Sequence, residues 1–203
     1  MSALHFSKYP QIKRMYEAGS TMAVIAQHFN VSLNAVVYAM RKGGIVRRSA
    51  SEARQAAFAQ KEASFQVKAL STKQEKQTVA IGIALYWAEG SKASGAKVVD
   101  FANSDPDMIV YFMRFLRTRY SIDEKRLRVL LYCHSDQDVQ ILIRFWSKVT
   151  GIPARQFSKP YVRKDFRQGG RKMNHGLIHV RYADKKLLSD ILGRIQVLRE
   201  MKE

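Results

Sequence analysis

The amino-terminal part of the chain carries the hydrophobic pattern of short helices. Apolar residues recur at helical spacing in three stretches, 12–16, 22–29 and 35–40. A residue that favours a turn follows each of these stretches: Gly19, Asn30 and Gly43. Residues 1–46 are therefore predicted to form a small all-α domain of three helices.

The turn between the second and third of these helices has a particular sequence. It reads Phe29-x-Val31-Ser32, in which Val31 is expected to enter the core and Ser32 to cap the third helix. The stretch YEAGSTMAVIAQHFNVSLNAVVYAMRKGGIVRR resembles the helix-turn-helix of resolvase-like and other phage and bacterial DNA-binding proteins. A helical hairpin that packs against another protein is the alternative interpretation.

The resemblance implies that the third helix enters the major groove of DNA. The residues expected to face base edges are Ser32, Asn34, Ala35 and Tyr38. The residues expected to contact phosphates are Arg41, Lys42, Arg47 and Arg48.

Residues 47–77 have a different composition. They are rich in Ala, Gln, Ser and Lys and contain neither Pro nor Gly, but their apolar positions are few. These residue types favour helix, and the thin apolar face offers little to bury. We predict a basic, partly helical linker, which either follows a DNA backbone or is a solvated helix.

Residues 78–203 show helical and strand patterns in alternation. The predicted elements are a helix over 78–90, a strand over 96–104, a helix over 105–120, a strand over 126–134, a helix over 136–150, strands over 157–163 and 176–182, and a helix from 184 onward. Strands interleaved with helices in this order predict an α+β or mixed α/β layer. The whole chain is thus expected to be a small all-α domain followed by an α+β domain.

The net charge of the chain indicates what kind of molecule it binds. The chain has 35 Lys and Arg against 17 Asp and Glu, a net charge of +18. So large an excess repels itself in the folded state and points to a polyanionic partner, nucleic acid first, with an anionic membrane surface or mere solubility as alternatives. The basic residues concentrate in two zones, 41–76 and 155–172. In the second zone, DNA contacts are expected from Arg155, Arg163, Arg167, Arg171 and Lys172.

Other classes are excluded by composition. A hydrophobic content of 46% argues against wholesale disorder, and the single cysteine can form neither an internal disulfide nor a structural zinc site. No apolar run approaches the length of a membrane helix, which is about 18 residues. We expect a cytoplasmic protein that associates with the nucleoid.

The helix predicted over 78–90 carries a stripe of small residues. Ala80, Ala84 and Ala88 lie four positions apart, so another helix can approach closely along this face. Glu89 follows in the last turn, where the negative end of the helix dipole disfavours a carboxylate. A metal ion, an arginine or Lys92 is expected to compensate it.

Three blocks of the α+β region resemble the LAGLIDADG homing-endonuclease family. GIALYWAEG (82–90) lies over the signature of that family, and VVDFANSDPDMIVYFMRFL (98–116) and FWSKVTGI (145–152) follow in order. The resemblance implies a homodimer in which the alanine-lined helices of two copies pack together. It also implies a sheet that grips duplex DNA, and Mg²⁺ held by Glu89 for phosphodiester hydrolysis. Basic residues near the scissile phosphate are then expected, with Lys159 and Lys164 as candidates.

The sequence departs from this family at several points. Tyr86 and Trp87 stand where smaller or polar residues are usual, and only one strand is evident between 90 and 105, although 91–97 could hide a short one. A simple ion pair at the helix end is the alternative role for Glu89. His175 and His179 share the period of a strand and could bind a metal, although isolated strand histidines are usually ordinary.

The interpretation that these patterns favour is a sequence-specific double-stranded DNA-binding protein. The more specific hypothesis is a Mg²⁺-dependent site-specific endonuclease that acts as a dimer. A non-catalytic transcriptional regulator with the same fold is the alternative. An RNA-binding module is a further alternative, because four aromatic residues at strand positions could stack bases or could simply be core: Phe101, Tyr132, Tyr161 and Tyr182.

Overall fold

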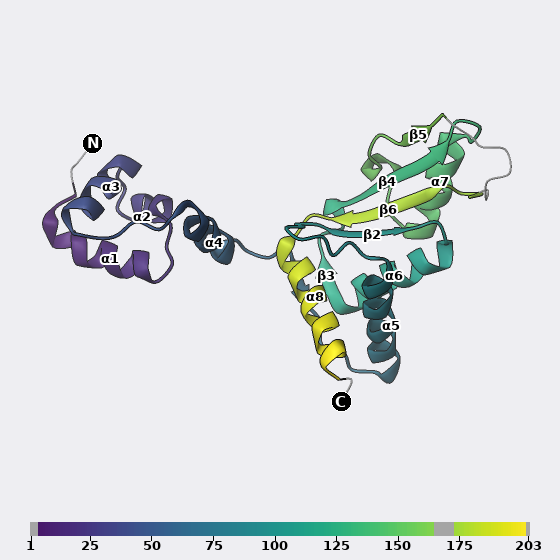
Figure 1. Cartoon of the computed structure of the whole chain (residues 1–203), viewed down its shortest axis with the longest axis horizontal. Helices are drawn as coiled ribbons and strands as arrows, with labels where there is room; N and C mark the ends of the chain where they lie inside the picture. The colour runs from purple at the N-terminus through teal and green to yellow at the C-terminus, as the bar shows by residue number, and fades with distance from the viewer. Residues whose placement is uncertain (1–3, 165–172, 202–203) are drawn as a thin grey trace. The chain divides into compact units, whose positions relative to one another are not determined.

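The computed structural model of the chain describes residues 4–164 and 173–201 (Figure 1). The chain divides into two compact units, Met1–Glu62 and Ala63–Glu203. The boundary between the two units falls inside residues 47–77, the stretch predicted to be a linker. Their first part belongs to the amino-terminal unit, and residues 63–77 belong to the second unit.

The amino-terminal unit is all-α. Its elements are the 3-10 helix η1 (Phe6–Lys8) and the helices α1 (Tyr9–Glu17), α2 (Met22–His28), α3 (Leu33–Lys42) and α4 (Ala50–Gln60). The first three α-helices enclose a small apolar core in which Ile12, Ile25, Val36 and Met40 are fully buried. The three predicted helices are confirmed. The helix α4, which has no buried residue, lies within the stretch predicted to be a partly helical linker.

Local side-chain chemistry sets the helix ends of this unit. The hydroxyls of Thr21 and Ser32 accept hydrogen bonds of 3.2 Å from the backbone amides of Val24 and Ala35, and so cap α2 and α3. Asn30 has a φ of 51°, the left-handed conformation that Asn tolerates. The chain can therefore reverse sharply between α2 and α3, as the sequence predicted.

The second unit is an α+β domain. Its helices are α5 (Lys73–Glu89), α6 (Pro106–Arg119), α7 (Val139–Thr150) and α8 (Lys185–Glu200), with the short 3-10 helices η2 (Glu124–Arg126) and η3 (Ala154–Gln156). Its strands are β1 (Phe65–Val67), β2 (Val99–Asn103), β3 (Tyr120–Ile122), β4 (Leu127–His134), β5 (Tyr161–Arg163) and β6 (Leu177–Tyr182).

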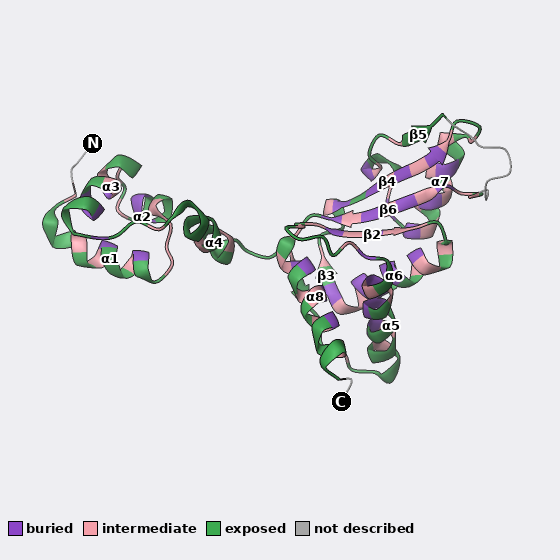
Figure 2. Cartoon of the chain, viewed as in Figure 1, coloured by how far each residue is buried: buried purple, intermediate pink, exposed green. Residues whose placement is uncertain are grey.

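Four strands form the main sheet in the order β2-β6-β4-β5. The β2–β6 and β6–β4 pairs are antiparallel, whereas β4 and β5 run parallel. Burial alternates along β4 and β6, so every second residue enters the core (Figure 2). The helices α5, α6 and α8 lie on one side of the sheet (Figure 1). The strand residues between the buried ones point to the other side, which we call the open face of the sheet.

Aromatic side chains fill the space between the sheet and these helices. The rings of Phe101 on β2 and Phe112 on α6 stack with centroids 4.2 Å apart, and Tyr86 on α5 lies 5.9 Å from Phe112. The helices α5 and α6 approach closely at Gly82, where a Cβ atom would stand only 2.1 Å from the Cβ of Phe115. This position therefore requires glycine.

Two parts of the second unit differ from the prediction. The helix α5 begins at Lys73 rather than at 78, because Thr72 and Glu75 form a capping box. The strands β1 and β3, three residues each, pair with one another and were not predicted. The segment 91–97 holds no named strand, although Gly90 forms an isolated antiparallel bridge with Phe101.

The packing at Gly82 yields a stability prediction with an internal control. Gly82→Ala should lower the free energy of unfolding by about 1–3 kcal/mol, because the added methyl group overpacks the α5–α6 contact. Gly193→Ala, in the middle of α8 with no atom within 4 Å of its new Cβ, should raise it by about 0.5–1 kcal/mol.

Guanidinium denaturation followed by tryptophan fluorescence measures both effects, since the two tryptophans, Trp87 and Trp146, lie in the second unit. If both variants changed the free energy of unfolding by the same amount in the same direction, the close α5–α6 contact at Gly82 would be contradicted.

Candidate nucleic-acid interface

The helix α3 has one buried face and one exposed face. Val36, Ala39 and Met40 enter the core. Asn34 is exposed on the other side, and Tyr38 exposes 48% of its surface. An amide beside a phenol on an exposed helix face offers donors and acceptors suited to base edges.

Basic side chains surround Tyr38 at the carboxyl end of α3. The guanidinium carbon of Arg41 lies 5.5 Å from the ring centroid of Tyr38, and the ammonium nitrogen of Lys42 lies 5.8 Å from it. Both basic residues are exposed. These cation–π contacts gather two positive charges at one end of the exposed face of α3.

The predicted base-contacting residues do not share one role. The hydroxyl of Ser32 is engaged in capping α3, and Ala35 is only partly exposed beside the core. Asn34 and Tyr38 are therefore the two predicted base-contacting residues that are exposed on α3.

The neighbouring arginines 47 and 48 also differ. Arg47 is exposed. Arg48 donates hydrogen bonds from its guanidinium to the backbone carbonyls of Tyr16 and Ser20, the latter at 2.9 Å, and stacks 4.1 Å from the Tyr16 ring. Its backbone amide also donates to the Tyr16 hydroxyl at 2.8 Å. Arg48 thus fastens the segment after α3 to α1, and its predicted phosphate contact stays a prediction.

The small-residue stripe on α5 is open to the exterior. Ala80, Ala84 and Ala88 are all exposed, and Ile81 beside them exposes 38% of its surface. Gly82 lies on the opposite side, where it contacts α6. The fold of this unit therefore leaves the alanine face uncovered.

Glu89 is exposed at the end of α5. Lys92, one of the predicted partners, instead donates to the carbonyls of Trp87 and Gly90 at 2.9 and 2.7 Å. This ammonium group offsets the negative end of the helix dipole through the backbone. Of the three predicted ways to compensate Glu89, the ion pair with Lys92 is therefore not the one that the structure contains.

The three predicted catalytic residues are not gathered in one chain. Glu89 precedes Gly90, which bridges to Phe101 on β2, whereas Lys159 and Lys164 are exposed on either side of β5. Because β2 and β5 are the outer strands of the sheet, three strand spacings of about 4.8 Å each separate them. A site that combines these residues is not assembled within one chain.

The second basic zone is described in part. Arg155 on η3 and Arg163 on β5 are exposed. Arg167, Arg171 and Lys172 lie outside the described residues. Within residues 4–164 and 173–201, no group of three or more His, Cys, Asp or Glu could hold a metal ion.

The open face of the sheet contains a charged cluster that the sequence reasoning missed. Asp100 on β2 receives contacts of 2.8 Å from His179 Nδ1 and from Arg181 Nε, both on β6. Burial raises the pKa of Asp100, but the hydrogen bonds and charges of His179 and Arg181 outweigh it, and the pKa lies below its ordinary value. The β2–β6 register, which pairs Asp100 with Arg181, creates this cluster and is not visible in the sequence.

The two histidines with a shared strand period have different surroundings. His179 lies within β6 against Asp100, as above. His175 precedes β6, and its ring stacks 3.8 Å from the ring of Phe145 on α7. Each histidine ring thus has its own contact within the chain.

The comparisons with known proteins leave the function to be argued from these residues. The chain matches no family model, no curated protein and no solved structure at a significant level. In the part of the chain that the structure describes, no helix is both long and apolar enough to span a membrane.

The contrast between the two arginines after α3 gives a direct prediction. Arg48→Ala should destabilise the amino-terminal unit by about 2 kcal/mol, because carbonyls of α1 and of the following turn lose a charged donor. Arg47→Ala, the matched control, should leave stability unchanged because its side chain is exposed.

Hydrogen–deuterium exchange of the α1 amides measures this difference without interference from the second unit. Equal exchange rates in the two variants would show that the Arg48 contacts do not stabilise the fold.

Proposed function

We propose that this chain is a sequence-specific double-stranded DNA-binding protein whose helix α3 occupies the major groove. The observation that carries the proposal is the exposed face of α3, on which Asn34 and Tyr38 stand beside Arg41 and Lys42. A capped helix that follows a tight turn and packs on two other helices is the geometry with which helix-turn-helix proteins read base edges.

The charge of the chain supports the same proposal. Arg41, Lys42 and Arg47 extend from the end of α3 into the segment that follows it, where phosphates flank a groove-bound helix. Binding would then release counterions and weaken steeply with salt. A protein of this kind would associate with the nucleoid.

Loss of a base contact and loss of a phosphate contact should have different effects on DNA binding. Asn34→Ala should change which sequences are preferred, because a bidentate amide–base contact is worth about 1–3 kcal/mol of discrimination. Arg47→Ala should weaken binding to all sequences and reduce the slope of log K against log salt by about one.

Selection from a random duplex library, followed by titration at several salt concentrations, measures both changes. If Asn34→Ala selected the same sites as the unaltered protein, α3 would not be the reading helix. Preferential binding of structured RNA over duplex DNA in the same titration would favour the RNA-binding alternative.

A second candidate function is magnesium-dependent cleavage of DNA by a homodimer of LAGLIDADG type. The exposed stripe of Ala80, Ala84 and Ala88, which ends at the exposed Glu89, favours it. Two copies packed along this stripe would bring two Glu89 carboxylates together, and such oxygen ligands suit Mg²⁺. The ion would activate water and stabilise the leaving oxygen of a phosphodiester.

The cleavage hypothesis is tested with supercoiled plasmids that contain selected sites, in the presence of Mg²⁺. Glu89→Gln should reduce nicking by at least a hundredfold, because the amide lacks the charge that binds the ion. Glu200→Gln, at the end of α8 and also exposed, is the matched control and should retain activity.

A further variant separates the dimer from the chemistry. Ala84→Arg would place a long side chain in the centre of the stripe and should abolish both nicking and the dimer in sedimentation equilibrium. If the unaltered protein and the Glu200→Gln control both bind DNA but do not nick it, the non-catalytic regulator is the correct interpretation.

A further inference from the structure

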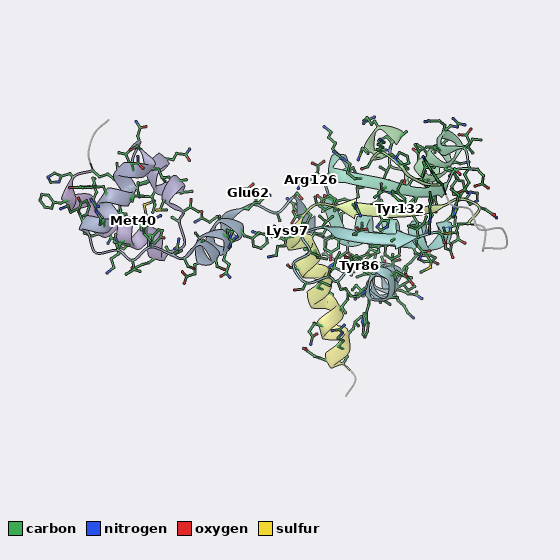
Figure 3. The ribbon with its side chains drawn as sticks, turned by 45° about the horizontal axis from the view of Figure 1, so that its top comes forward. Met40, Glu62, Tyr86, Lys97, Arg126 and Tyr132 are labelled. Carbon is green, nitrogen blue, oxygen red and sulfur yellow. The ribbon has the colours of Figure 1, made fainter. Side chains whose placement is uncertain are left out.

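A pocket of about 840 Å³ opens on the second unit where β4, β5 and β6 meet. It lies at the end of the open sheet face on which Tyr132 stands (Figure 3). Its described lining includes aromatic side chains from all three strands and no Asp or Glu. The described lining is thus cationic and aromatic, unlike the apolar core beneath the sheet.

Three rings follow one another across the pocket. Tyr132 on β4 pairs in register with Tyr161 on β5, and their ring centroids are 5.2 Å apart. The ring of His179 on β6 lies 5.1 Å from Tyr132 on its other side. Because Asp100 holds the Nδ1 atom of His179 at 2.8 Å, the position of the third ring is fixed.

The exposed surface of Tyr161 distinguishes it from the aromatic residues of the core. Phe101 and Tyr182, which belong to the same predicted set of aromatic strand residues, have no exposed surface, whereas Tyr161 exposes 58%. A core role therefore accounts for the first two only. An exposed tyrosine that extends a row of rings at a pocket mouth is suited to stacking with a planar ligand.

Positive charge lies at the same mouth. Arg163, which pairs in register with His134, and the adjacent Lys164 both line the pocket and are exposed. A guanidinium group beside aromatic rings can bind a phosphate while a base stacks on the rings. The pocket volume falls in the range of small-ligand sites, about 300–1,000 Å³.

We propose that this pocket binds an unpaired nucleotide, with its base against Tyr161 and Tyr132 and its phosphate on Arg163 and Lys164. A base within a duplex is stacked on both sides and cannot occupy such a pocket, so the ligand is either a free nucleotide or an unstacked nucleotide of a strand. The proposal concerns the second unit and does not depend on duplex binding by α3.

The first test is isothermal titration calorimetry of the full chain with thymidine, thymidine monophosphate and an oligothymidylate eight nucleotides long. Tyr161→Ala should weaken binding of the monophosphate about tenfold, and Tyr161→Phe, which keeps the ring, should restore it. Tyr111→Ala is the matched control, because Tyr111 is an exposed tyrosine with an arginine 5.4 Å from its ring, but lies on α6.

The phosphate contact has its own readout. Arg163→Ala should weaken the monophosphate about tenfold and leave the nucleoside unchanged. Much tighter binding of the oligonucleotide than of the monophosphate identifies a strand as the source of the ligand, whereas equal affinities per site identify a free nucleotide.

Two results would overturn the proposal: unaltered monophosphate binding by Tyr161→Ala, or no measurable binding of any of the three probes at millimolar concentration. Neither result affects the duplex titrations of Asn34→Ala and Arg47→Ala. Failure of this proposal and failure of the proposed function are therefore distinguishable.

Discussion

The one-sided burial of the four-stranded sheet is the constraint on which the second unit depends. Side chains alternate between the two faces of a strand, and α5, α6 and α8 cover only one face. Residues such as Val129, Leu131, Ile178 and Val180 are consequently buried. The intervening residues are released from core packing, and this is what allows charged and aromatic side chains to gather on the other face.

The helices that cover the buried face of the sheet also pack closely against one another, α5 against α6. Gly82 lets the backbone of α5 lie against Phe115, so the aromatic residues of both helices meet over the sheet. Because Gly82 faces α6, the opposite face of α5 is exposed, and this face carries Ala80, Ala84 and Ala88. The exposed small-residue stripe thus follows from the way the helix is packed, and a partner is one use of it that the fold permits.

The parts of this fold that depend on local pattern could be predicted from the sequence. The three helices of the first unit and their Asn30 turn were predicted, as were the α+β class and the long elements such as α6 and β4. The strands β1 and β3 could not be, because three residues hold too little periodicity and their stability comes from pairing across more than fifty residues.

The candidate sites show the same limit more sharply. The exposure of Asn34 and Tyr38 follows from helical periodicity and was foreseen, whereas the role of Arg48 depends on where the carbonyls of Tyr16 and Ser20 lie after folding. The row of Tyr132, Tyr161 and His179 depends on a parallel and an antiparallel pairing at once. Strand register of this kind is a long-range property that no short motif records.

The net charge of the chain is a poor guide to the roles of individual basic residues. Arg48 and Arg181 hydrogen-bond to groups of the chain itself, and Lys92 donates to carbonyls at the end of α5, while Arg41 lies exposed beside Tyr38 and Arg163 lines the pocket. The exposed face of α3 and the pocket at β5 lie on different units, and one is a convex helix face whereas the other is a pocket. A convex helix fits a groove and a pocket fits a single unstacked base, so the proposed duplex binding and the proposed nucleotide binding would use separate surfaces.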